Sequence, residues 1–144
     1  MTALADLDPG DAVARLLAEH DEAWLEGLRA ALDRRLAGRG LERVVRTWGL
    51  SRTELGELFG VTRQAVSRWL DEGVPSERAV AVADVEAITD LLERYLKRER
   101  IPAVVRRPAA RLGDQSLVEL CAAGHHAEAL RLTRAMFAFT DAHA

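Results

Sequence analysis

Cysteine, proline and aromatic residues are scarce in this sequence. The 144 residues contain a single cysteine, so an internal disulfide is excluded and a reducing cytoplasm is the expected compartment. Only four prolines interrupt the chain, which favours helix. Aromatic residues make up 5% of the total, so a core must be built mainly from Leu, Val and Ala.

Long apolar runs are also missing. No stretch approaches the roughly 18 apolar residues that a membrane helix needs, and the first residues do not form a basic leader followed by an apolar segment. We therefore expect a cytoplasmic protein without a membrane partner.

The residue patterns of enzymes are absent too. No Ser/His/Asp arrangement, glycine-rich phosphate loop or paired carboxylates stand in a recognisable frame, so we predict no catalytic residue and no enzyme activity. Cys121 lies between Leu120 and Ala122 in an apolar helix, which indicates a buried thiol rather than a nucleophile. His125 and His126 are adjacent, as turn residues at the surface would be, and no ligand spacing surrounds them, so neither a metal nor another cofactor is expected.

Alanine and leucine are plentiful, and the composition of 49% hydrophobic and 30% charged residues is that of a globular protein. The predicted fold class is all-α. Three parts are expected along the chain: an N-terminal helix in residues 1–40, a helix-turn-helix in residues 41–74, and a C-terminal helical domain in residues 75–144.

The segment Leu50–Asp71 predicts two short helices joined by a tight turn. Ser51 and Glu54 have the Ser-x-x-Glu spacing of a capping box, so the first helix should begin after Ser51. Gly60 can take a positive φ and end that helix, and Thr62 can cap the second. Leu, Phe, Ala, Val and Trp side chains at helical spacing should face inward. This layout is typical of a helix-turn-helix.

The second helix of such a motif lies in the major groove of DNA. Its polar side chains suit that task, since Arg pairs bidentately with guanine and Gln with adenine. The predicted DNA-binding residues are Thr62, Arg63, Gln64, Ser67 and Arg68.

Charge is unevenly distributed along the chain. The formal net charge is -3, but residues 41–70 carry five basic and three acidic groups. Such a modest basic excess should need a homodimer, with two half-sites, to bind operator DNA tightly.

The N-terminal part predicts one long amphipathic helix from Ala12 to Ala37, ended by Gly38 and Gly40. Its apolar stripe must cover either the rest of the chain or a second subunit, and dimerisation is the favoured role. A separate short helix, Leu41–Trp48, should support the helix-turn-helix, with Trp48 and Trp69 in the core.

The C-terminal part predicts three helices. The first is long and runs from Ser76 to Lys97. Ser116 and Glu119 form a second capping box that opens a short helix ending at Ala123, and a last helix spans about Ala127 to Phe139.

Two stretches of the sequence, which follow one another along the chain, resemble parts of a known family. GVTRQAVSRWLDEGVP looks like the Xre-type repressors, and IPAVVRRPAARLGDQSLVELCAAGHHAEALRLTRAMF is similar to the toxin-binding domain of the Xre/MbcA/ParS antitoxins. The resemblance covers about Leu41 to Phe139 and leaves out the N-terminal helix. It implies an antitoxin that binds a RES-domain toxin, an NAD-consuming enzyme, and represses its own operon.

The resemblance also directs attention to the C-terminal residues for toxin contact: Arg106, Arg107, Arg111, Leu112, Arg131, Arg134, Met136 and Phe137. The alternative for Arg106 and Arg107 is that they bind the acidic long helix of the same chain. The alternative for the whole protein is a stand-alone helix-turn-helix transcriptional regulator whose C-terminal helices dimerise or sense a ligand.

Overall fold

The computed structural model describes residues 2–142, with side chains described for residues 2–138. Within that range the chain is all-α, as predicted, with one isolated bridge between Ala109 and Gln115. The described residues include no helix that is both long and apolar enough to cross a bilayer. The α-helices are α1 (Pro9–Glu19), α2 (Glu22–Trp48), α3 (Arg52–Phe59), α4 (Arg63–Glu72), α5 (Ala79–Tyr95), α6 (Ile101–Val104), α7 (Leu117–Ala122) and α8 (His126–Ala142). The 3-10 turns are η1 (Leu4–Asp6), η2 (Ser76–Arg78), η3 (Arg98–Arg100) and η4 (Ala110–Leu112).

Contacts divide the chain into two compact units, residues 1–33 and 34–144. The first unit holds η1, α1 and the beginning of α2, and none of its described side chains is buried. Leu17, Trp24 and Leu32 are 61%, 45% and 52% exposed. This unit therefore has no core of its own and presents an unusual amount of apolar surface.

The prediction of one helix from Ala12 to Ala37 was wrong, because the chain forms two helices that are interrupted at His20 and the second of them continues past Ala37. The chain is extended at His20, and Asp21 begins a new helix because its carboxylate accepts a hydrogen bond from the Trp24 backbone N–H at 2.8 Å. The new helix, α2, does not stop at Gly38 or Gly40. It continues to Trp48 and includes the residues predicted as a separate helix.

Close packing explains why Gly38 and Gly40 stand inside α2. A Cβ on Gly38 would lie 3.0 Å from the carbonyl oxygen of Trp69 in α4, and one on Gly40 would overlap the carboxylate of Glu86 in α5. Gly38 therefore lets the backbone of α4 approach α2, whereas the space at Gly40 is occupied by the end of the flexible Glu86 side chain. The helix ends at Gly49 instead, where φ is 65°.

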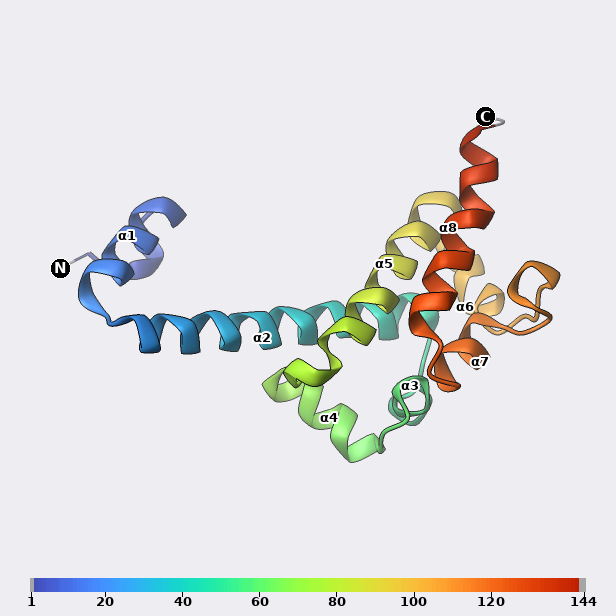
Figure 1. Cartoon of the computed structure of the whole chain (residues 1–144), viewed down its shortest axis with the longest axis horizontal. Helices are drawn as coiled ribbons and strands as arrows, with labels where there is room; N and C mark the ends of the chain where they lie inside the picture. The colour runs from blue at the N-terminus through green and yellow to red at the C-terminus, as the bar shows by residue number, and fades with distance from the viewer. Residues whose placement is uncertain (1, 143–144) are drawn as a thin grey trace. The chain divides into compact units, whose positions relative to one another are not determined.

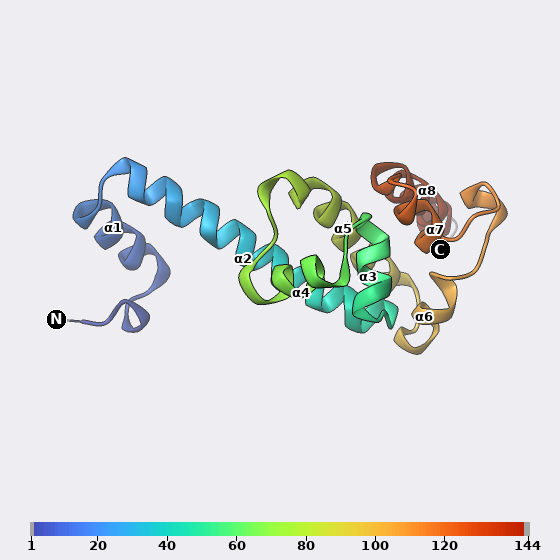
Figure 2. The same cartoon turned by 90° about the horizontal axis from the view of Figure 1, so that it is seen from below.

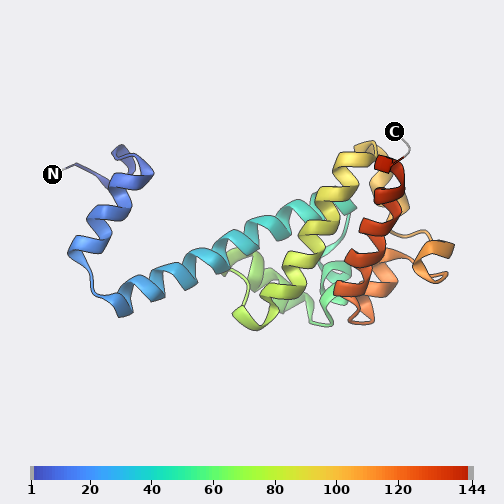
Figure 3. The ribbon, with the colours of Figure 1, turned by 45° about the horizontal axis from the view of Figure 1, so that its top comes forward.

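The second unit is built around α5. Figures 1 and 3 show α8 lying along α5, with α7 and α3 next to each other at one end of α8. A fully buried Trp48 joins the end of α2 to this arrangement, because its indole N–H donates to the Thr89 hydroxyl on α5 at 2.9 Å. The predicted core positions of Trp48 and Trp69 are thus confirmed.

One continuous core serves both the helix-turn-helix and the C-terminal helices. Its buried members come from every α-helix of the second unit, and the largest fully buried side chains are Trp48, Leu41, Leu55, Leu58, Ile88, Leu92 and Ile101. The observed unit therefore spans two of the three parts expected from sequence, and the division at residue 74 is a functional proposal rather than a break in packing.

Substitution of a glycine in α3 provides a test of this packing. A Cβ on Gly56 would lie 2.6 Å from the carbonyl oxygen of Val61, where the turn folds back on the helix. We expect Gly56→Ala to lower the free energy of unfolding by about 1–3 kcal/mol, because the overlap with backbone outweighs the better helix propensity of Ala. Urea unfolding followed by circular dichroism measures the change.

Gly27→Ala is the matched control. Gly27 also lies inside a helix, but nothing stands within 4 Å of its Cβ position. We expect this variant to gain helicity without any loss of stability. Equal destabilisation by both substitutions would show that contact with Val61 is not the cause.

Candidate functional site

The helix-turn-helix forms as the sequence predicts. The Ser51 hydroxyl accepts from the Glu54 backbone N–H at 3.1 Å, and the Glu54 carboxylate accepts from the Ser51 N–H at 3.0 Å. Gly60 takes a φ of 67°, which ends α3. The Thr62 hydroxyl then caps α4 by accepting from the Ala65 N–H at 3.1 Å. Figure 2 shows the short connection between α3 and α4.

The outer face of α4 holds the residues predicted to read DNA. Arg63, Gln64 and Arg68 are exposed, Ser67 is half-buried, and together with Asp71 they line one shallow groove. The inner face carries Val66 and Trp69, both buried. The side chains at the start of α4 are therefore free to approach a base edge or a phosphate.

Two residues that the sequence reasoning missed modify this face. Arg52, the first residue of α3, donates a hydrogen bond to the Ser67 hydroxyl at 2.9 Å and so adds a second element to the basic surface. Asp71 places a carboxylate at the far end of the same groove. Neither could be found from the spacing within α4 alone, because Arg52 belongs to the preceding helix and Asp71 looked like a helix end.

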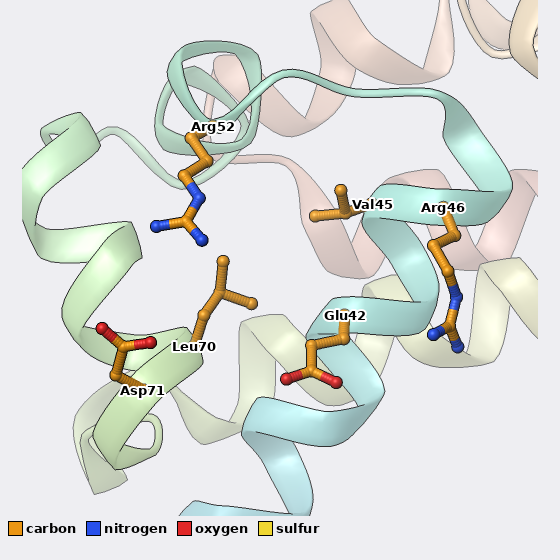
Figure 4. Close-up of a pocket in the computed structure, with 6 residues that line it drawn as sticks. All are labelled: Glu42, Val45, Arg46, Arg52, Leu70 and Asp71. Carbon is orange, nitrogen blue, oxygen red and sulfur yellow. The ribbon is translucent and has the colours of Figure 1, made fainter.

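A second hollow of about 330 Å³ lies on the other side of Arg52, between the ends of α2 and α4. Figure 4 shows Val45 and Leu70 projecting toward one another there, while Arg52 enters from α3. The remaining lining residues are Glu42, Arg46 and Asp71. The lining therefore includes two acidic and two basic side chains, whose formal charges cancel.

Arg106 bonds within the chain. Its guanidinium donates to the carbonyl oxygens of Trp48 (2.9 Å), Gly49 (2.8 Å) and Pro102 (2.8 Å), and it pairs with the carboxylate of Glu54 at 3.0 Å. These contacts join the end of α2 and the start of α3 to α6. They favour an internal role for Arg106, although its partners lie outside the long helix α5 that the sequence suggested.

Glu54 has a pKa below its ordinary value. The first cause is the hydrogen bond from the Ser51 backbone N–H, and the second is the hydrogen bond from Arg106. Both interactions favour the carboxylate form. The capping box of α3 and the bonds of Arg106 therefore act on the same charged group.

Arg107 has a different environment from its neighbour. It lies at an apolar cavity of about 160 Å³, which we call the α5–α8 slot. The slot is enclosed by α5, α6, α7, α8 and the η4 segment, and its lining residues are Leu92, Leu96, Val104, Arg107, Ala109, Leu112, Leu117, Thr133, Met136 and Phe137.

The predicted toxin-contact residues thus fall into three groups. Arg107, Leu112, Met136 and Phe137 meet at the slot. Arg111 on η4 and Arg131 and Arg134 on α8 are exposed, with Arg131 paired to Glu128 of its own helix at 2.9 Å. Arg106, as described above, binds the end of α2.

The two histidines between α7 and α8 are not equivalent, and the prediction that both are surface turn residues was wrong for His126. His126 begins α8, is half-buried, donates to the Leu58 carbonyl oxygen at 2.7 Å and stacks on Phe59 at 5.3 Å between ring centroids. It therefore attaches α8 to the end of α3. His125 is exposed.

Cys121 is buried, as the sequence predicted. Burial raises its pKa to about 12, with a smaller contribution from the charge of Asp84. The thiol is therefore protonated near neutral pH and is a poor nucleophile.

These features define an all-helical chain in which a helix-turn-helix shares its core with a C-terminal group of helices. The fold is similar to that of a chain in the crystal structure of the Mycobacterium tuberculosis MbcT-MbcA toxin-antitoxin complex, with a TM-score of 0.57 and 21% sequence identity. The likeness covers 69% of this chain and 91% of that chain. No protein-family model and no curated protein matches the sequence. The resemblance expected from sequence is thus confirmed at the level of the fold.

The neighbouring arginines provide a test of the internal role of Arg106. We expect Arg106→Ala to lower the free energy of unfolding by about 1–3 kcal/mol, because the carbonyl groups at the end of α2 lose their donor. Arg107→Ala removes the same side chain from a site where it makes no such bonds, so its effect should stay within about 0.5 kcal/mol. Chemical denaturation compares the two, and similar losses would contradict the assignment.

Proposed function

We propose that this chain is the antitoxin of a toxin-antitoxin pair. The observation that carries the proposal is the similarity of its fold to a chain of the MbcT-MbcA complex, extending over 91% of that chain. A plain helix-turn-helix repressor would not need the additional helices α6, α7 and α8, and their apolar slot provides a surface for a second protein.

The partner we propose is a RES-domain toxin that consumes NAD. This choice rests on the resemblance of IPAVVRRPAARLGDQSLVELCAAGHHAEALRLTRAMF to the toxin-binding domain of the Xre/MbcA/ParS antitoxins. The contact surface would centre on the slot residues Arg107, Leu112, Met136 and Phe137 and extend over Arg111, Arg131 and Arg134. Arg106 would support that surface by holding α6 against the end of α2.

Co-expression with the product of the adjacent gene, which we propose to be a RES-type toxin, tests this proposal. We expect the two proteins to co-purify and NAD consumption by the toxin to stop in the complex. Arg134→Glu should weaken binding at least about tenfold, because it reverses an exposed charge on α8 within the proposed contact surface.

Arg63→Ala on α4 is the control, since it changes the proposed DNA reader and should leave neutralisation of the toxin intact. The antitoxin assignment would be ruled out if the chain did not bind the product of the adjacent gene and did not change the NAD consumption of that protein.

The second part of the proposed function is repression of the chain's own operon through α4. Arg63, Gln64 and Arg68 are exposed on the face opposite the buried Val66 and Trp69, as major-groove reading requires. Ser67 would act from a fixed position, because Arg52 already donates to its hydroxyl.

Operator binding should therefore depend on these side chains. We expect Arg63→Ala or Gln64→Ala to weaken binding to the promoter of its own operon by about 1–3 kcal/mol in a gel-shift titration. Arg134→Glu should bind that DNA as tightly as the unchanged protein. If both α4 variants kept full affinity, another surface would have to be the reader.

We further propose that the chain binds DNA as a homodimer formed through its first unit. Residues 1–33 expose Val13, Leu17, Trp24 and Leu32, but they also carry eight acidic and two basic groups. Apolar contact would draw two copies together while like charges oppose it.

This balance makes the salt dependence of dimerisation diagnostic. We expect sedimentation equilibrium to show tighter dimers when the ionic strength rises from about 0.05 to 0.5 M, because salt screens the repulsion. Leu17→Glu combined with Leu32→Glu should give monomers. Dimers that weaken in salt, or that survive both substitutions, would place the interface elsewhere.

A stand-alone transcriptional regulator is the alternative function. The complete helix-turn-helix geometry favours it as much as it favours the antitoxin, since operator reading needs no toxin. The two functions differ in one observable: an antitoxin forms a stable complex with the neighbouring gene product, whereas a regulator binds its operator with no such partner.

A further inference from the structure

The side chains that line the α5–α8 slot are mostly apolar, and the hydroxyl among them already has a hydrogen-bond partner. Among the lining residues that the structure describes, Thr133 contributes the one hydroxyl, and that hydroxyl donates to the Ala129 carbonyl oxygen at 2.7 Å. Among the described residues, no buried side-chain nitrogen or oxygen lacks a hydrogen-bond partner. Away from Arg107, the described lining side chains therefore offer no free hydrogen-bonding group, and this part of the slot favours an apolar group.

The shape of the slot is set by packing. Phe137 forms one wall and stacks against Tyr95, with ring centroids 4.6 Å apart and planes 8° from parallel. Leu92 and Leu112, both buried, form other parts of the wall. A volume of about 160 Å³ matches one large apolar side chain, and cavities of about 150 Å³ with such walls bind a benzene-sized group.

Arg107 is the one charged residue among the described side chains that line the slot. It is exposed, and no salt bridge joins it to another described side chain. A guanidinium in this position favours a carboxylate and disfavours a basic segment. The slot thus combines an apolar recess with a single site for negative charge.

We infer that the slot receives one large apolar side chain of the toxin, from a segment that also places a carboxylate on Arg107. This inference rests on the proposed antitoxin function and adds the chemistry by which the partner is recognised. The matching feature in the toxin is a surface Leu, Met or Phe with an Asp, a Glu or the chain's terminal carboxylate next to it. Met136, with its flexible thioether, would adapt the slot to whichever of these side chains enters.

Filling the slot is the first test. Ala109 is half-buried and lines the slot, whereas the adjacent Ala110 is exposed and does not. We expect Ala109→Leu to weaken the binding of the proposed RES-type toxin at least about tenfold, and Ala110→Leu to leave that binding unchanged. Calorimetric titration of the folded variants measures both affinities.

Reversing the charge is the second test, and it does not disturb packing. We expect Arg107→Glu to weaken the toxin complex at least about tenfold, and Arg107→Lys to retain part of the affinity. Arg98→Glu is the control, since Arg98 is an exposed arginine on η3 outside the slot. Equal affinities for Ala109→Leu, Arg107→Glu and their controls would overturn the inference while leaving the antitoxin function in place.

A small probe separates this inference from the proposed function. N-acetyl-leucine carries an isobutyl group and a carboxylate, and N-acetyl-leucinamide lacks the charge. We expect the acid to shift the methyl NMR signals of Leu112 and Met136 in the full chain, and to do so at lower concentration than the amide. Ala109→Leu should abolish the shifts. Absence of shifts would overturn the inference. Equal binding of the acid and the amide by both the unchanged protein and Arg107→Glu would also overturn it. This test does not need the toxin.

Discussion

The junction at Trp48 and Gly49 is the constraint on which the second unit depends. The Trp48 indole is buried against Thr89 of α5, and the carbonyl groups of both residues accept hydrogen bonds from Arg106. Arg106 also holds Glu54, whose carboxylate caps α3. The end of α2, the start of the helix-turn-helix and the C-terminal segment are therefore fixed by one buried ring and one guanidinium.

This junction connects the two surfaces on which the proposed function depends. The helix-turn-helix is attached to the C-terminal helices at two places, through Arg106 at the start of α3 and through His126 at its end. A protein bound at the α5–α8 slot would touch α5 and α8, which share a core with α3 and α4. The same unit therefore carries both the proposed reader and the proposed partner site.

Short-range rules account for the parts of the site that were predictable. Both capping boxes, the positive φ of Gly60 and the orientation of Arg63 and Gln64 follow from residues within a few positions of each other. The errors have a different origin. Gly38 and Gly40 looked like helix ends, yet they serve contacts with α4 and α5, which lie about 30 to 50 residues further along the chain.

The sequence by itself determined the all-α class, the helix-turn-helix and the identity of the residues on its outer face, because helical periodicity and capping are local properties. Only the tertiary structure decided what Arg106 and Arg107 do. The two arginines are adjacent in sequence, but one bonds to the end of α2 and the other stands at an apolar slot whose walls come from residues 92 to 137. No local pattern distinguishes them, because each role depends on long-range packing that brings separate helices together.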